Sequence, residues 1–145
     1  MDENQYRQTY QQVNALPCVF ERAILRQCAI CHHAQRLNIA EREAVSCQSE
    51  SDRKLCREFL GLMHQKSQFA VKADNPDEPL PFGKEIKIQC GALLGLKTEM
   101  SADTPIDIIL VLLDAVNRYS ELEAFPFESL IREVTAFKTR RPRKD

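Results

Sequence analysis

Five of the six cysteines in the chain fall within the segment 17–56. The segment contains one close pair in a Cys-Ala-Ile-Cys sequence, with single cysteines on either side of it. Zinc and iron–sulfur centres need about four soft ligands around one ion or cluster, and thiolate sulfur suits both. The density and spacing of these residues therefore predict a cysteine-ligated centre. The candidate ligands are Cys18, Cys28, Cys31, Cys47 and Cys56.

Four of these five residues are enough to complete such a centre. We take Cys18, Cys28, Cys31 and Cys47 as the first set of ligands, with Cys56 as the replacement ligand. A CxxC pair offers two neighbouring thiols, but one of its two members could be spare when five candidates compete for four positions. Cys47 lies in a serine-rich segment that is expected to be a loop, and a loop can supply one of the remaining ligands.

The spacing favours an iron–sulfur cluster over zinc. Structural zinc sites usually draw on two close pairs of ligands, whereas this chain has one pair flanked by single cysteines. A [4Fe-4S] cluster is therefore the expected cofactor, and zinc is the alternative. A third interpretation needs no metal, because free cysteine behaves as a small, buried hydrophobic residue. Cys90, in a stretch that alternates apolar and polar residues, fits that interpretation best.

Two histidines follow the CxxC pair directly and are weaker candidates. His32 and His33 could supply one ligand, or one hydrogen-bond donor to a ligating sulfur. Neighbouring side chains on a helix point about 100° apart, so at most one of the two would face the centre. A solvated surface pair is the competing interpretation.

Length and composition place the chain among ordinary globular proteins. It has 145 residues, of which 43% are apolar and 28% charged, and this size suits a single domain. The N-terminus is polar and lacks a secretory signal, and the longest apolar run is too short to span a bilayer. We therefore expect a soluble, cytoplasmic protein without membrane insertion, whose cysteines are reduced or metal-bound rather than joined in disulfides.

Hydrophobic periodicity predicts a mainly α-helical domain of about five helices with at most a minor β element. The best strand signal is the alternation over residues 85–90, which either pairs with residues 68–71 or is overridden into helix. Thr104 and Pro105 resemble the cap and first residue of a helix. Ser49 or Ser51 is expected to cap another helix. The expected helices cover residues 3–16, 19–45, 52–71, 104–119 and 127–137.

The chain is expected to form one domain, 1–145, with four segments in order. A cysteine-bearing helical half, 1–72, is followed by a connection, 73–83, that contains three prolines. A second half, 84–137, leads to a mobile tail, 138–145, in which basic residues crowd.

Motifs for common enzyme chemistry are missing from the sequence. There is no GxSxG, no HExxH and no glycine-rich phosphate loop, so we favour a non-enzyme. The catalytic CxxC of thioredoxin-like proteins follows a strand, and no strand is expected before this one. We therefore expect a small iron–sulfur protein that acts in electron transfer, redox sensing or as an accessory or assembly factor with a protein partner.

Two other functional classes stay open. A zinc- or cluster-dependent regulator would contact nucleic acid through the basic tail, although this partner is not favoured because no DNA-binding module accompanies the tail. A metal-free helical module for protein interaction is the second alternative.

Overall fold

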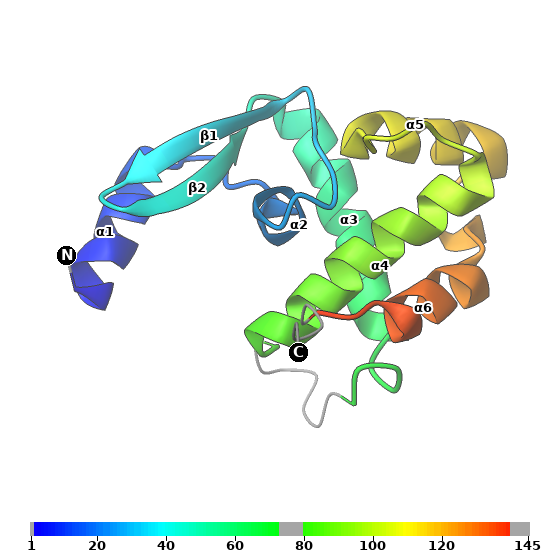
Figure 1. The fold of residues 1–145 in the computed structure, drawn as a ribbon. Coiled ribbons are helices and arrows are strands. Elements are labelled where there is room, and N and C mark those ends of the chain that lie inside the picture. The colour runs from blue at the N-terminus through cyan, green and yellow to red at the C-terminus, as the bar shows by residue number, and fades with distance from the viewer. Residues whose placement is uncertain (1, 73–79, 140–145) are drawn as a thin grey trace.

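A computed structural model of the chain describes residues 2–72 and 80–139. Figure 1 shows a helical body from which the first helix and a β-hairpin project together, with a short helix at the junction. The mainly α-helical class with a minor β element is confirmed. The elements are α1 (Glu3–Val13), α2 (Glu21–Leu25), β1 (Ala34–Ile39), β2 (Arg42–Cys47), α3 (Glu50–Lys66), α4 (Phe82–Met100), α5 (Ile108–Tyr119), the 3-10 helix η1 (Leu122–Ala124) and α6 (Phe127–Ala136).

The β-hairpin replaces most of the helix that was expected over 19–45, and that prediction is wrong. Only α2 is helical there, and Gln27, with φ of 67°, lies just beyond its end. Strands β1 and β2 pair antiparallel with Ile39 opposite Arg42, so the turn consists of two residues. Its first residue, Ala40, has φ of 56°, a left-handed geometry that usually belongs to glycine or asparagine. The turn therefore has none of the usual sequence signals.

Helix α3 agrees with the sequence more closely. Its N-cap is Ser49, whose hydroxyl accepts a hydrogen bond from the backbone N–H of Asp52 at 3.3 Å. This cap is one of the two that the sequence predicted. The helix begins at Glu50 and ends at Lys66, before the expected end at residue 71. Helices α1 and α6 also form within their expected ranges.

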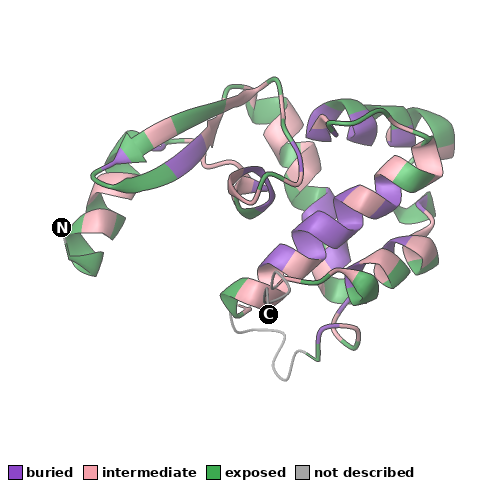
Figure 2. Cartoon of the chain, viewed as in Figure 1, coloured by how far each residue is buried: buried purple, intermediate pink, exposed green. Residues whose placement is uncertain are grey.

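Residues 85–90 form part of α4, so the predicted strand is wrong in its position. Ile86, Gln89, Cys90 and Leu93 are all buried and follow the i, i+3, i+4, i+7 spacing of a helix face. Ile88 is buried as well, because α4 runs through the middle of the body and is covered on several sides. Figure 2 shows the buried residues concentrated along this helix, whereas α1 and the hairpin are mostly exposed. Burial on several faces produced the misleading alternation.

Helix α4 packs closely against α6 because two glycines of α4 face α6. An added Cβ at Gly91 would lie 2.4 Å from Val134 Cα, and one at Gly95 would lie 3.0 Å from Leu130 Cα. Such distances leave no room for a side chain. The backbones of α4 and α6 therefore lie closer together than they could if larger residues stood at these two positions.

Helix α5 begins three residues later than the sequence suggested. Asp107 is its N-cap, and the carboxylate accepts a hydrogen bond from the Leu110 N–H at 3.5 Å. Thr104 and Pro105 precede it and are joined by a cis peptide bond, so the predicted cap at Thr104 is wrong.

Two predicted segments fall largely outside the described residues. These are residues 73–79 of the connection and residues 140–145 of the basic tail. Among the helices that the structure describes, none is long and apolar enough to cross a membrane.

Candidate metal centre

Four cysteines from four different segments line one small cavity. They are Cys18, Cys31, Cys47 and Cys56, and the cavity has a volume of about 20 Å³. All four side chains are free thiols and are partly buried. The cavity lies where the hairpin, the α2 region, α3 and the start of α5 meet. The rest of its wall consists of Val19, Phe20, Ala34, Arg53 and Ile108.

The hairpin fixes two of the four cysteines. Cys47 ends β2, and its N–H donates to the carbonyl of Leu16 at 2.7 Å. The N–H of Cys18 donates to the carbonyl of Val45 on the same strand at 2.9 Å. The segment before α2 therefore continues the sheet edge beside β2, and this pairing brings two residues 29 positions apart in the sequence to one cavity.

The other two cysteines come from the helical body. Cys56 lies in the second turn of α3, seven residues after its Ser49 cap. Cys31 follows Ile30, which forms a parallel bridge with Asp107 at the start of α5. In that bridge the Ile30 N–H donates to the Ile106 carbonyl at 2.8 Å, and its own carbonyl accepts from Ile108 at 2.8 Å. Cys31 is thereby anchored to α5.

Backbone N–H groups lie beside three of the sulfurs. The backbone N–H of Phe20 beside Cys18, and those of His33 and Ile109 beside Cys31, lower the pKa of these thiols and oppose part of the effect of burial. The sulfur of Cys47 lies 3.5 Å from the N–H of Ser49. Donors of this kind favour thiolate sulfur, and around iron–sulfur clusters they tune the reduction potential.

Burial keeps the thiols protonated when no cation accompanies them. It raises the pKa of Cys18 to about 12, the Phe20 N–H partly opposes this, and the sulfurs of Cys31 and Cys47 raise the pKa further. Burial likewise raises the pKa of Cys56 to about 12, with a further contribution from the neighbouring cysteines. The pKa of Cys31 is raised for the same chief reason. A metal would therefore bind by replacing these protons.

Arg53 is the charged residue in the described wall of the cavity. Its Nε donates to the carbonyl of Pro17 at 2.6 Å, which holds the guanidinium between the cysteine-bearing segment and α3. A cation in this place would offset part of the negative charge of several thiolates. Arg53 could not be predicted from the sequence, since one arginine on a polar helix face carries no distinguishing signal.

The two predicted histidines lie at the edge of this region and bind carboxylates. His32 Nδ1 lies 3.2 Å from an Asp107 oxygen, and His33 Nε2 lies 2.8 Å from an Asp52 oxygen. Neither imidazole belongs to the described residues that line the cavity. Both contacts instead fix the segment around Cys31, one to α5 and one to α3.

Cys28 is the predicted ligand that the structure places elsewhere. It forms a disulfide with Cys90 of α4, with the two Cα atoms 5.8 Å apart. The segment 26–33 is not helical, so the CxxC pair does not share a helix face and its two sulfurs point to different places. Cys56 takes the fourth position at the cavity. The expected burial of Cys90 is confirmed, but the expectation that it is a free core thiol is wrong.

The four side chains at the cavity are of the type that binds thiolate-ligated metal groups, but they do not form a closed ligand set in this structure. Four cysteine sulfurs, an apolar wall and backbone N–H donors are the usual surroundings of such centres. Within residues 2–72 and 80–139, no three His, Cys, Asp or Glu side chains are grouped closely enough to hold a single ion. The cavity is about the size of one water molecule, so the four side chains would have to turn outward around a larger group.

Comparisons with known proteins add no information about this site, because no protein-family model, curated protein or solved structure matches the chain.

Proposed function

We propose that the chain holds an iron–sulfur cluster, [4Fe-4S], on Cys18, Cys31, Cys47 and Cys56. The observation that carries this proposal is that these four free thiols, spread over 39 residues of sequence, line one cavity. A folded chain has little reason to gather four such residues for packing alone, because any small apolar side chain would fill the same space.

The sequence separation of the four cysteines favours a cluster over zinc. Cys47 and Cys56 are the nearest neighbours along the chain, and eight residues separate them. Structural zinc sites usually contain at least one pair of ligands two to four residues apart. A four-iron cluster instead takes one thiolate at each of four corners, a geometry that single cysteines from separate segments can supply.

The position of the site suits electron transfer, redox sensing or an accessory role in assembly rather than substrate chemistry. All four cysteines are partly exposed, so a bound cluster would lie near the surface, within reach of a partner protein or a small oxidant. The wall offers apolar side chains and Arg53 but no described acid or base aimed into the cavity. The proposed interaction partner is therefore another protein, which gives an electron to the cluster or takes one from it.

Purification without oxygen, followed by a visible spectrum and analysis of iron, sulfide and zinc, tests the proposal. We expect a brown protein with about four irons and four sulfides per chain. Stoichiometric zinc without sulfide would mean that the site holds structural zinc and not an iron–sulfur cluster. A colourless, metal-free but folded protein would refute both.

Single Cys→Ser variants identify the ligands, and the disulfide cysteines serve as matched controls. Replacing Cys18, Cys31, Cys47 or Cys56 should remove most of the iron and sulfide. The variant Cys28→Ser also removes a sulfur from the same segment, but it should keep the metal content of the parent. Loss of the cluster in Cys28→Ser, together with its retention in Cys56→Ser, would contradict this ligand set. The ligands would then be the first set from the sequence, Cys18, Cys28, Cys31 and Cys47.

A further inference from the structure

We propose that the Cys28–Cys90 disulfide is a second redox site, at which a small carboxylate-bearing thiol exchanges with the protein. This site shares no cysteine with the proposed cluster, so either proposal can fail alone. It rests on three observations: the disulfide itself, a cavity that has one of its two cysteines in the wall, and the charge of the residues around that cavity.

The cavity reaches Cys28 but not Cys90. It has a volume of about 200 Å³, which is enough for several waters or a small organic molecule. Cys28 is partly exposed and lines the wall, whereas Cys90 is fully buried in α4. An entering thiolate would therefore meet the sulfur of Cys28, and Cys90 would be the leaving sulfur. Most of the remaining wall is apolar, with Ile24, Ala29, Leu94, Pro105 and Ile106 among its residues.

Both charged residues in the described wall of this cavity are basic. They are Arg36 on β1 and Lys97 on the last turn of α4. Arg36 also forms an ion pair with Glu43 at 2.9 Å across the hairpin, which offsets part of its charge. Lys97 therefore makes the larger contribution to the positive potential. A thiol that carries a carboxylate suits this wall better than a neutral or a cationic one.

The exchange balances in two steps. The entering thiolate bonds to the Cys28 sulfur, the Cys28–Cys90 bond breaks, and Cys90 leaves as a thiolate that takes up a proton. The thiolate of a second molecule of the same thiol then bonds to the sulfur of the first, the bond between that sulfur and Cys28 breaks, and Cys28 leaves as a thiolate that takes up a proton. The protein gains two electrons and two protons, while two small thiols are oxidised to one disulfide. The reverse sequence reforms the Cys28–Cys90 bond.

Exchange rates with thiols of different charge test the proposal on the full-length protein. Three small thiols differ in the charge of the group near the reacting sulfur. Mercaptoacetate carries a negative charge, 2-mercaptoethanol is neutral, and cysteamine carries a positive charge. Each rate is divided by the rate of the same thiol with a neutral model disulfide, which removes differences in intrinsic reactivity. Opening of the disulfide is followed by alkylation and peptide mass analysis, so that the other four cysteines do not interfere.

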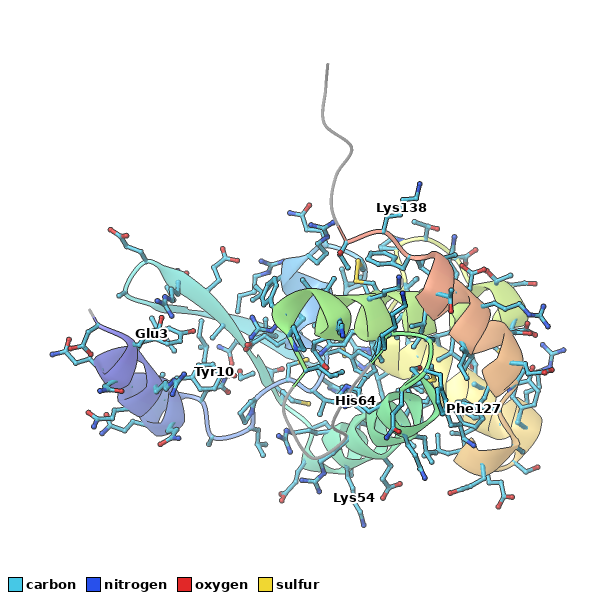
Figure 3. All side chains as sticks on the ribbon, turned by 90° about the horizontal axis from the view of Figure 1, so that it is seen from below. Glu3, Tyr10, Lys54, His64, Phe127 and Lys138 are labelled. Atoms are coloured by element: carbon cyan, nitrogen blue, oxygen red, sulfur yellow. A yellow bond between two sulfur atoms is a disulfide. The ribbon has the colours of Figure 1, made fainter. Side chains whose placement is uncertain are left out.

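We expect mercaptoacetate to exceed cysteamine by about tenfold at low ionic strength, with the ratio falling toward one as salt is added. The variant Lys97→Gln should remove most of the preference. Lys54→Gln is the matched control, because Lys54 lies on α3 and points away from the body (Figure 3), and it should leave the ratio unchanged. Equal normalised rates for the three thiols, or a disulfide that none of them opens, would overturn the proposal.

A trapping variant identifies the attacked sulfur. In Cys90→Ser the thiol of Cys28 has no partner, so the disulfide of mercaptoacetate should leave one stable adduct on Cys28. In Cys28→Ser the buried Cys90 should react at least tenfold more slowly, since burial limits access. Faster modification of Cys90 than of Cys28 would contradict the assignment of the entry side.

Discussion

Cys18 and Cys47 are held on neighbouring segments by two backbone hydrogen bonds, from Cys18 to Val45 and from Cys47 to Leu16. The hairpin thus fixes two thiols before any metal is bound. Cys56 sits on a regular helix and is equally constrained, whereas Cys31 depends on the bridge to α5. Of the four sulfurs at the cavity, that of Cys31 therefore relies most on contacts between distant parts of the chain.

Arg53 should raise the reduction potential of the proposed cluster. Arg53 is part of the cavity wall, its Nε is held on the carbonyl of Pro17, and a positive charge beside a cluster favours the more negative, reduced state. We expect Arg53→Gln to shift the midpoint potential to more negative values, by on the order of tens of millivolts. Protein-film voltammetry or a spectroscopic titration would measure the shift.

Two further variants separate charge from structure in that experiment. Arg53→Lys keeps the charge and should restore most of the potential. Lys54→Gln removes the same charge one residue along, from a side chain that points to solvent, and should change the potential little (Figure 3). A shift of equal size in Lys54→Gln would show that the effect is one of net charge alone.

Asp107 should stabilise both α5 and the segment that carries Cys31. Its carboxylate caps the helix, accepts the His32 N–H at 3.1 Å and contacts the His32 ring at 3.2 Å. Replacing it by alanine should lower the free energy of unfolding by about 1–2 kcal/mol. Urea denaturation measures the loss, and Asp103→Ala, an exposed acid in the preceding loop, should stay within about 0.5 kcal/mol of the parent. Equal losses in the two variants would contradict this role for Asp107.

The metal-free chain should lose stability in alkaline solution. Burial raises the pKa of Cys18 and of Cys56 from the ordinary value of 9.0 to about 12, so the folded chain keeps protons that the unfolded chain releases. Because the unfolded state binds fewer protons in this range, the free energy of unfolding falls as pH rises from about 9 to about 12. Below about pH 9 both states are protonated and these two thiols contribute no slope.

A double variant isolates this contribution from the other groups that titrate at high pH. Cys18→Ala with Cys56→Ala should show a shallower fall in the free energy of unfolding than the parent between pH 8 and pH 10. The comparison needs only urea denaturation of the metal-free chain at the two pH values. Parallel curves would mean that the thiols ionise in the folded state at their ordinary pKa.

The sequence predicted the parts of the fold that depend on local signals. Ser49 caps α3 as expected, and the helical periodicity near both ends of the chain gives α1 and α6. The hairpin was missed because its turn at Ala40 uses a left-handed residue without glycine or asparagine. Residues 85–90 were misassigned because α4 is buried on several faces, which hides its helical period.

The grouping of the cysteines was predictable only in part. Their density indicated a shared site, and the structure brings together three of the four first choices with the replacement, Cys56. The exchange of Cys28 for Cys56 depends on the path between α2 and β1, where loss of helix turns Cys28 toward α4. No local pattern encodes that path, since it is fixed by the bridge between Ile30 and Asp107, 77 residues apart. Whether the four cysteines bind a metal stays a prediction.

The close packing of α4 on α6 gives the last prediction, for which the chain supplies its own control. Gly91→Ala would place a methyl group 2.4 Å from Val134 Cα, and the backbone there can yield only if the helices separate. We expect a loss of about 1–3 kcal/mol in the free energy of unfolding, measured by urea or thermal denaturation. Gly61→Ala makes the same change in α3, where nothing lies within 4 Å, and should stabilise the protein by about 0.5–1 kcal/mol. A neutral or stabilising effect of Gly91→Ala would mean that α4 and α6 do not approach this closely.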